Sequence, residues 1–462
     1  MSDRDSTISV VNPATEEIVD TTPKGTVEDV DTAVEAAWDT FEEWSETDAI
    51  DRGATLSAAA DRIESEIDDL AVLLTKEQGK PVRESKLELQ QFIRTLRYNA
   101  GLARDIRGEQ TSLAHGETGI VVKEPYGVCG GITPWNFPIS LFGNKIAPGL
   151  AAGNTMVIKP ASTTPLTTIR VTELMESAGL PAGAINIVTG DGSTVGNAIV
   201  EHDDIKKVGF TGSTDAGRTV MRSAASTLKP VTLELGGSDP MIVCEDAEFD
   251  DAVRAASVGR FFNNGQACLA IKRLFVHESI AESFVDELES KVEGLALGNG
   301  LDDAMIGPLH ADWLADEMDE FVDDAVSRGA TVLTGGGRSE EHETGYFYEP
   351  TLLEDVSEEA KISNEECFGP VLPIYTFSDL DDAIERANDT IYGLGSSVWT
   401  RDISKGKRVA EELEAGYTWI NARQIERNEL PFGGLKQSGI GKEHSRQGLD
   451  AYLQTRSIVV GN

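Results

Sequence analysis

Two short segments carry side chains that can do covalent and acid–base chemistry. Cys268 ends the segment FFNNGQAC at residues 261–268, and Glu234 lies within LELGG at 233–237. A cysteine thiolate attacks a carbonyl carbon with less activation than a hydroxyl needs, and a glutamate beside paired glycines can move protons to or from water. Each residue alone has an ordinary explanation, because a lone cysteine is most often a small buried apolar side chain and a lone glutamate is usually exposed.

Four further motifs follow one another along the chain. They are TPWNFP at residues 133–138, FTGSTDAG at 210–217, EECFGP at 365–370 and PFGG at 431–434. With the cysteine and glutamate segments, they make the chain resemble the aldehyde dehydrogenase superfamily over roughly residues 8–460. The resemblance implies NAD(P)-dependent oxidation of a small-molecule aldehyde to a carboxylic acid, in the hydrolytic, non-acylating branch.

The resemblance implies three catalytic side chains. Cys268 would be the nucleophile, forming a thiohemiacetal with the aldehyde and then a thioester. The oxyanion that forms needs hydrogen-bond donors already in place, and the family uses the amide at Asn136 and the backbone N–H of Cys268. Glu234 would be the general base that activates water for thioester hydrolysis. Members that transfer the acyl group to coenzyme A typically lack this glutamate, so a CoA-acylating aldehyde dehydrogenase is the less favoured alternative.

The expected cofactor is NADP or NAD. The segment 210–217 follows an expected strand and opens an expected helix, where free N–H groups bind phosphate. The glycine-rich run at 190–196 departs from the usual dinucleotide pattern and is weak evidence alone. The implied cofactor-binding residues are Thr133, Trp135, Lys159, Ser162, Gly192, Gly196, Phe210, Gly212, Ser213, Gly217, Leu235, Glu366 and Phe368.

Some of these positions have a particular implied role. Ser213 would lie beside the pyrophosphate, Lys159 at the adenosine ribose, and Glu366 at the nicotinamide ribose with Phe368 near the ring. Without the resemblance, Lys159 reads as a surface lysine at a strand end and Glu366 as a solvated acid. Ser162 stands where NAD-preferring members often carry glutamate, whose charge would repel the 2′-phosphate of NADP. We therefore expect NADP to be accepted well.

The substrate is less constrained than the cofactor. The family lines its tunnel with residues that correspond here to Phe137, Leu141, Asn144, Ala267, Leu269 and Phe432. Succinate-semialdehyde enzymes commonly carry arginine where Asn144 stands, which lowers that assignment. Arg423 and Arg427 lie in a charged loop before PFGG, and either could bind an acidic substrate tail or simply be a surface charge. A semialdehyde dehydrogenase of the succinate or 2-oxoglutarate type is therefore a second alternative.

Two other classes of function compete with a dehydrogenase. A cysteine hydrolase or acyltransferase would need a histidine near the thiol, and none stands near Cys268 in sequence, although a spatial neighbour remains open. A non-catalytic binding protein on this fold would not need Cys268, Glu234 and Asn136 together. NAD(P)H formation with an aldehyde panel separates these classes.

The elements that must position these residues follow from periodicity. A capping box at 26–29 begins one helix, a second is expected over 49–76 and a third over about 84–105. Strands and helices then alternate from 153 to 243 and in a second block from 250, which is typical of parallel sheets wound by helices. The predicted fold class is α/β, similar to aldehyde dehydrogenase, with two parallel-sheet domains and a β-strand oligomerisation arm. Expected strands are 119–123, 128–132, 155–158, 185–188, 207–210, 273–276 and 331–333, with an extended piece at 452–459; expected helices are 165–178, 194–201, 250–263, 279–295, 312–328 and 379–388.

The resemblance also divides the chain into domains. Residues 1–106 and 126–235 would form the cofactor-binding domain, and residues 236–440 the catalytic domain. Residues 107–125 and 441–462 would form the oligomerisation arm, which implies a homodimer or homotetramer. The sequence pattern by itself does not indicate this arm.

Composition excludes several partners. The chain has 79 acidic and 40 basic residues and a net charge of −39, so nucleic acid is repelled. No apolar run reaches the length of a membrane span, and the polar N-terminus lacks a signal region, which predicts a cytoplasmic protein. Four cysteines without C-x-x-C spacing and histidines without H-x-x-x-H spacing suggest neither disulfides nor a metal site. The dispersed acid suits molar salt, which screens self-repulsion, so we expect a halophilic source.

Overall fold

A six-stranded sheet organises the first half of the chain. The computed structural model describes residues 6–461, and the strand order in this sheet is β17-β9-β8-β5-β6-β7. Every pairing is parallel except that of β17, which returns from far along the chain to pair antiparallel with β9. The strands are β5 (Val128–Ile132), β6 (Thr155–Lys159), β7 (Ile185–Ile187), β8 (Lys207–Thr211), β9 (Val231–Glu234) and β17 (Gly439–Ile440).

Helices cover this sheet and bury its apolar strands. The expected capping box at Thr26 is present and begins α1, because the Thr26 hydroxyl accepts from the Asp29 N–H and the Asp29 carboxylate accepts in return. Phe92 and Phe142 stack between α4 and α5 in the largest apolar cluster. The helices are α1 (Val27–Glu46), α2 (Ala49–Glu64), α3 (Ile67–Gln78), α4 (Val82–Leu102), α5 (Pro138–Ala151), α6 (Leu166–Ser177), α7 (Asn197–Glu201), α8 (Thr214–Ala224) and α15 (Ser445–Asp450).

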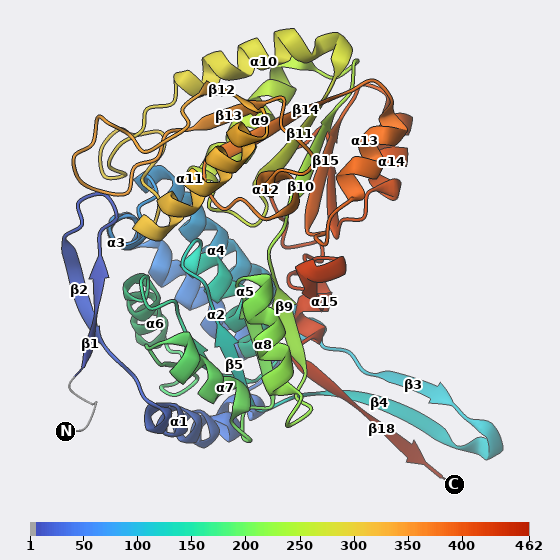
Figure 1. Cartoon of the computed structure of the whole chain (residues 1–462). Coiled ribbons are helices and arrows are strands. Elements are labelled where there is room, and N and C mark those ends of the chain that lie inside the picture. The colour runs from blue at the N-terminus through green and yellow to red at the C-terminus, as the bar shows by residue number, and fades with distance from the viewer. Residues whose placement is uncertain (1–5, 462) are drawn as a thin grey trace.

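A seven-stranded sheet organises the second half and forms the upper body in Figure 1. Its order is β12-β13-β14-β11-β10-β15-β16, and only the β12–β13 pairing is antiparallel. The predicted α/β fold with two largely parallel sheets is therefore confirmed. The strands are β10 (Asp239–Val243), β11 (Ile271–His277), β12 (Thr331–Thr334), β13 (Thr351–Glu354), β14 (Val371–Phe377), β15 (Gly395–Trp399) and β16 (Tyr417–Ile420); the helices are α9 (Phe249–Phe261), α10 (Glu278–Glu293), α11 (Asp312–Ser327), α12 (Lys361–Asn364), α13 (Leu380–Asn388) and α14 (Ile403–Glu412).

Three expected helices differ in their bounds. The helix expected over 49–76 is two helices, because Glu66 leaves helical geometry (φ −115°, ψ 16°) between α2 and α3. Ser65 and Glu66 bond to Arg62, and such local side-chain bonds compete with helix continuation. The helix expected over 84–105 ends at Leu102 and continues as a 3₁₀ turn to Asp105. The helix expected over 194–201 begins as a π-turn at 192–196 before α7.

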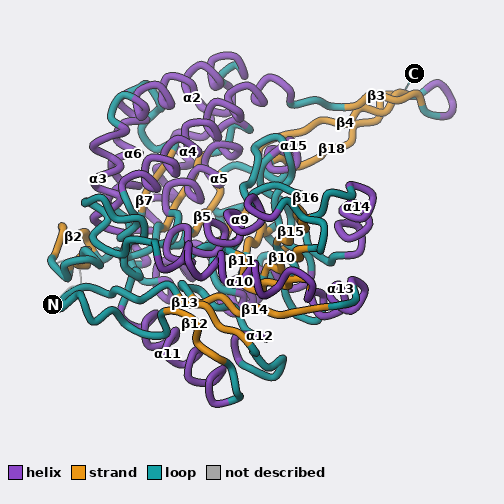
Figure 2. Tube along the Cα trace, turned by 90° about the horizontal axis from the view of Figure 1, so that it is seen from above, coloured by secondary structure: helices purple, strands orange, loops and turns teal. Residues whose placement is uncertain are grey.

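Three antiparallel strands form an arm that leaves the body. These are β3 (Glu109–Ser112), β4 (Thr118–Pro125) and the C-terminal β18 (Leu453–Val460), in the order β18-β4-β3. Strand β18 pairs with β4 along its full length, so the end of the chain is tied to a segment more than 300 residues earlier. Figures 1 and 2 both show the arm projecting from the rest of the molecule. A separate hairpin, β1 (Thr7–Val11) with β2 (Ile18–Pro23), lies near the N-terminus.

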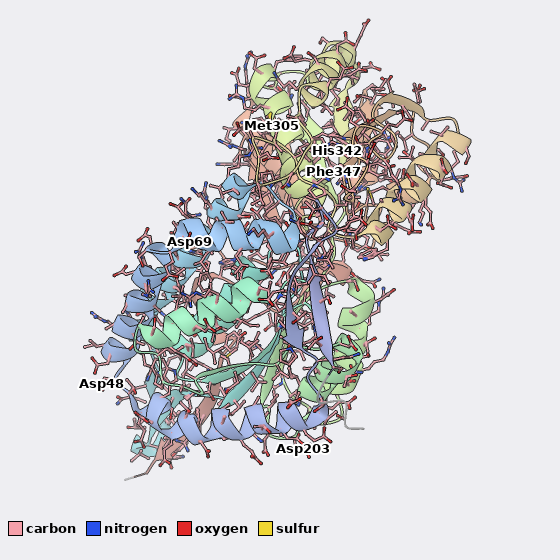
Figure 3. All side chains as sticks on the ribbon, turned by 90° about the vertical axis from the view of Figure 1, so that its left-hand side faces the viewer. Asp48, Asp69, Asp203, Met305, His342 and Phe347 are labelled. Atoms are coloured by element: carbon pink, nitrogen blue, oxygen red, sulfur yellow. The ribbon has the colours of Figure 1, made fainter. Side chains whose placement is uncertain are left out.

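The acidic residues are spread over many elements of the surface. Asp69 lies on α3, Asp48 precedes α2 and Asp203 lies in the turn after α7, and all three are exposed, as Figure 3 shows. Within residues 6–461 no helix is both long enough and apolar enough to cross a membrane.

Candidate active site

The nucleophile segment is a loop held in an unusual backbone conformation. After α9 the chain passes through left-handed Asn263 and Asn264 (φ 51° and 54°), which asparagine tolerates better than most residues. The Asn263 N–H donates to the Glu84 carboxylate at 2.8 Å, and the Asn264 amide donates to the Gly307 carbonyl at 2.9 Å. These two bonds fix the loop to residues from both halves of the chain. Cys268, at the end of the loop, is partly exposed.

The structure brings Asn136 to this loop. The Asn136 side-chain N–H donates to the carbonyl of Gln266 at 3.0 Å, two residues before Cys268. The backbone carbonyl of Asn136 accepts from the Lys80 ammonium at 2.6 Å and from the Asn263 amide at 3.0 Å. Asn136 is only 4% exposed. Its amide therefore has a fixed place beside the nucleophile segment, as an oxyanion donor requires.

Glu234 ends β9 in a buried position. Neither carboxylate oxygen has a hydrogen-bond partner among the described residues. Burial raises the pKa of Glu234 well above its usual value, and the nearby Glu443 carboxylate raises it further, while Lys145 and Lys442 act in the opposite direction. The PFGG motif is what admits this side chain: a Cβ at Gly433 would lie 2.7 Å from a Glu234 oxygen.

A buried ion pair lies beside Glu234. The Lys145 ammonium pairs with Glu443 and donates to the Thr211 hydroxyl at 2.6 Å. The predicted substrate residue Asn144 donates to the other Glu443 oxygen at 3.1 Å. Lys145 and Glu443 were not expected from the sequence, since neither stands in a distinctive local pattern. Contact between Asn144 and a substrate stays a prediction.

A second buried cation joins the nucleophile segment to Glu366. The Lys272 ammonium donates to the carbonyl of Cys268 at 2.6 Å and lies 3.2 Å from the Glu366 carboxylate. Glu366 also accepts from the Gly237 N–H at 3.0 Å. A Cβ at Gly237 would lie 3.1 Å from the Cys268 carbonyl oxygen, so the LELGG segment, Glu366 and Cys268 meet here.

Two aromatic residues predicted to contact the cofactor meet as well. Trp135 lies edge-on to Phe368, with ring centroids 5.6 Å apart. Its other neighbour is His310, which stacks on the indole at 4.6 Å. His310 also bonds to Thr163 and to the Gln78 carbonyl. Burial lowers the pKa of His310 to about 4, so the ring is neutral. The position of His310 against Trp135 was not predicted, because a single histidine outside any motif does not indicate a site residue.

The N-terminus of α8 offers the predicted phosphate site. Ser213 caps the helix by accepting from the Ala216 N–H at 3.3 Å, and its side chain is exposed. Gly212 donates to the Glu234 carbonyl at 3.1 Å, which sets the helix start beside β9. Leu235 packs against Gly217, where a Cβ would collide with it. Free N–H groups of an eleven-residue helix at the end of a parallel strand fit a pyrophosphate.

The adenosine end of the predicted site lies at the end of β6. The Lys159 ammonium donates to the Pro160 carbonyl at 2.8 Å, and burial lowers its pKa to about 8. The Ser162 hydroxyl donates to the Gly190 carbonyl at 2.8 Å. Gly192 and Gly196 bound the π-turn that follows.

The remaining predicted residues lie around these groups. Phe137 stacks near Phe262 at 6.0 Å, and Phe432 lies edge-on to His444 at the same distance. Thr133 and Phe210 are buried and Leu141 is partly exposed. Arg423 and Arg427 are exposed, whereas Glu426 between them is partly buried. Neither arginine makes an ion pair within residues 6–461.

One group of side chains within residues 6–461 has metal-ligand spacing. It comprises Cys244, Glu245 and Asp246. The Lys405 ammonium lies 2.9 Å from Glu245 and 3.3 Å from Asp246, so a lysine already neutralises these carboxylates.

The fold and the site define a class of protein: an α/β oxidoreductase in which a cysteine loop lies beside a dinucleotide-type sheet. Residues 1–458 match the Aldehyde dehydrogenase family. A glutarate-semialdehyde dehydrogenase of Pseudomonas putida is 40% identical, with 99% of this chain and 95% of that protein covered. The chain belongs to the aldehyde dehydrogenase family, and it is an NAD(P)-dependent aldehyde dehydrogenase.

Solved structures agree with this assignment. A betaine aldehyde dehydrogenase of Staphylococcus aureus in complex with NAD+ superposes with a TM-score of 0.96 at 39% identity, covering 99% of this chain and 92% of that one. An E. coli NADP dependent enzyme superposes with a TM-score of 0.97 at 39% identity, covering 99% and 95%.

Proposed function

We propose that Cys268, Asn136 and Glu234 carry the oxidation of an aldehyde to a carboxylic acid. The observation that carries this proposal is the Asn136 amide, held 3.0 Å from the carbonyl of Gln266 beside the nucleophile. The Cys268 thiolate adds to the aldehyde carbon, and the oxygen gains a negative charge. The Asn136 amide and the Cys268 N–H stabilise that charge. A nicotinamide cofactor, which Ser213 at the start of α8 and Glu366 would hold, would supply the acceptor for the hydride lost from the former aldehyde carbon, so that a thioester would remain on Cys268.

Glu234 then governs hydrolysis. Its buried, unpartnered oxygens are free to take a proton from water. The water oxygen bonds to the thioester carbon, the C–S bond breaks, and the thiolate of Cys268 returns as the acid is released. The Lys145 and Lys442 charges favour the ionised form of Glu234 that this step requires.

The test is NAD(P)H formation at 340 nm with an aldehyde panel, with and without coenzyme A. Turnover independent of coenzyme A supports hydrolysis, and strict dependence supports the acylating alternative. Cys268→Ala should abolish turnover and leave cofactor binding intact, because no other side chain there replaces a thiolate. Residual oxidation above about one per cent of wild type would remove Cys268 as the nucleophile.

We further propose that NADP is accepted well. Ser162, which is partly exposed, places no carboxylate against a 2′-phosphate, and its hydroxyl could turn from Gly190 to donate. Lys159 supplies a positive charge nearby. Ser162→Glu should lower kcat/KM for NADP relative to NAD by roughly thirty- to a thousandfold, through about 2–4 kcal/mol of lost bonding and added repulsion. An unchanged NADP/NAD ratio would show that Ser162 does not face the 2′-position.

The alternative substrate that we propose is an acidic semialdehyde. The exposed Arg423 and Arg427 support a semialdehyde of the succinate or 2-oxoglutarate type, and the relative from P. putida is named for glutarate semialdehyde. If either arginine binds the far carboxylate, replacing it with glutamine should raise KM for an acidic semialdehyde only. An equal change for a neutral aldehyde of similar length would indicate a structural role.

We propose that the arm oligomerises the protein and that the domains follow the expected boundaries at 106, 125, 235 and 440. The apolar Ile458, Val459 and Val460 on β18 are exposed, which favours burial against another subunit. Ending the chain after Tyr452 should convert a dimer or tetramer to monomers in light scattering, and an unchanged mass would exclude the arm as the oligomerisation element.

We also propose that the protein works in a cytoplasm rich in salt, which would suit its acidic surface.

A further inference from the structure

Lys272 is a buried cation in direct contact with the nucleophile segment. It lies on β11, four residues after Cys268, and is 1% exposed. Its ammonium donates to the carbonyls of Cys268 at 2.6 Å and Ala267 at 3.0 Å. A buried ammonium without polar partners would be costly. The two carbonyl contacts offset that cost, and they explain why Lys272 can be buried here.

The same ammonium reaches the carboxylate expected to hold the nicotinamide ribose. Lys272 lies 3.2 Å from Glu366, whose other contact is the N–H of Gly237 at 3.0 Å. A Cβ at Gly236 would collide with Glu366, so the paired glycines admit this carboxylate. One cation thus joins Glu366 to the peptide of Cys268.

Charges around the thiol give this contact a consequence. Burial raises the pKa of the Cys268 thiol, and the carboxylates of Asp239, Glu366 and Glu426 raise it further. Lys272 is the cation that acts in the opposite direction. The ammonium of Lys272 is held at the Cys268 carbonyl and therefore acts on the thiol of the same residue. Its effect on the thiol pKa is strong because water is excluded there.

We propose that Lys272 is a positioning residue that couples the Cys268 nucleophile electrostatically to the ribose-binding carboxylate Glu366. It stabilises the thiolate and neutralises Glu366, and a change at Glu366 is transmitted through it to the thiol. The inference rests on the proposed roles of Cys268 and Glu366.

The experiment measures thiol acidity without aldehyde turnover. The rate of iodoacetamide alkylation of the full-length apoprotein is followed against pH, and mass spectrometry assigns the label to Cys268; the other three cysteines are buried. Lys272→Met should raise the thiol pKa by about one unit, which is a tenfold loss of thiolate. Glu366→Gln should lower it, because a negative charge near the thiol is removed. Lys291→Met, which removes a surface lysine paired with Glu287, should leave it unchanged.

The opposite signs separate coupling from disruption. A structural defect at either residue would not raise the pKa in one variant and lower it in the other. In the Lys272→Met background, Glu366→Gln should shift the thiol pKa by less than it does in wild type, because the cation that transmits the change is absent. Unshifted pKa values in both single variants overturn the inference. If Lys272→Met does not fold, Glu366→Gln decides alone, since an unchanged or raised pKa contradicts the coupling. Turnover by Cys268→Ala would instead overturn the proposed function.

Discussion

At the scale of single residues, burial sets the acidity of the reacting groups. Cys268 and Glu234 both have pKa values raised first by burial. Charge then adjusts each one: Lys272 acts on the thiol, and Lys145 and Lys442 act on the carboxyl. A base with a raised pKa holds a proton better once it has taken one from water, provided that it is ionised at working pH.

Glu234→Gln tests this role. We expect hydride transfer to persist and deacylation to slow on the order of 100-fold or more, since general bases contribute about 10²–10⁴. Pre-steady-state mixing should therefore show an NAD(P)H burst followed by slow turnover. In wild type, turnover should rise as pH increases through the raised pKa, because the base must be ionised. Steady-state turnover at the wild-type rate in the variant would remove Glu234 from the mechanism.

His310 gives a residue-scale prediction about stability. The pKa of its ring falls from 6.5 to about 4 on folding, because the ring is buried. Between these values the unfolded chain binds a proton that the folded chain does not. The neutral His310 ring therefore contributes fully to the free energy of unfolding above about pH 6.5. As pH falls toward 4 this contribution is lost, by about 3 kcal/mol in all.

Urea unfolding between pH 4 and 7 measures this slope. His310→Phe keeps a ring against Trp135 and should unfold with a shallower pH dependence, though with lower stability because the bonds to Thr163 and Gln78 are lost. His342→Phe, at a partly exposed position, serves as the control. Equal slopes in wild type and His310→Phe would contradict the assignment.

At the scale of elements, the short strand β17, from late in the chain, lies beside the end of β9 that carries Glu234. Strand β17 pairs Gly439 with Glu234 and Ile440 with Leu233. The PFGG turn before it passes over the Glu234 side chain with Gly433 at φ 155°. The close approach at Gly433 leaves no room for a side chain, so this turn sets where Glu234 can lie.

Gly433→Ala should therefore impair turnover. A Cβ 2.7 Å from the Glu234 oxygen forces the carboxylate to move, and a displacement of about 1 Å can lower kcat on the order of 100-fold. Gly337→Ala is the matched control, because its Cβ would meet nothing within 4 Å. Steady-state kinetics and melting temperatures of both variants measure the effect. Wild-type kcat in Gly433→Ala would show that Glu234 tolerates a shifted position.

At the scale of the whole molecule, surface charge dominates. A net charge of −39 is distributed over separate elements instead of being confined to one tail. Salt shortens the range of this repulsion from about 10 Å at 0.1 M to about 3 Å at 1 M. The folded state, which is more compact than the unfolded chain, gains most from that screening.

The melting temperature should therefore rise by several degrees or more as KCl increases from about 0.1 M to 2 M, at which the Debye length falls to a few ångströms. Sucrose, which stabilises by exclusion without screening charge, is the control. A larger rise in KCl than in sucrose supports adaptation to salt. Full stability in dilute buffer with no response to KCl would count against a halophilic source.

Local pattern in the sequence was sufficient for the fold class and for the motifs that identify the family, because residue type and periodicity act over a few neighbours. The capping box at Thr26 and the alternation of strands and helices are examples. The break at Glu66 was missed, since the apolar period runs on through it.

Only the tertiary structure decided which charges surround the reacting groups. Lys145 and Glu443 are 298 residues apart and meet in the core. Lys272 on β11 meets Glu366, which lies in the segment between α12 and β14. His310 reaches Trp135 in the same way. Burial and pairing of charges depend on contacts between distant segments, and no local pattern of residues encodes them.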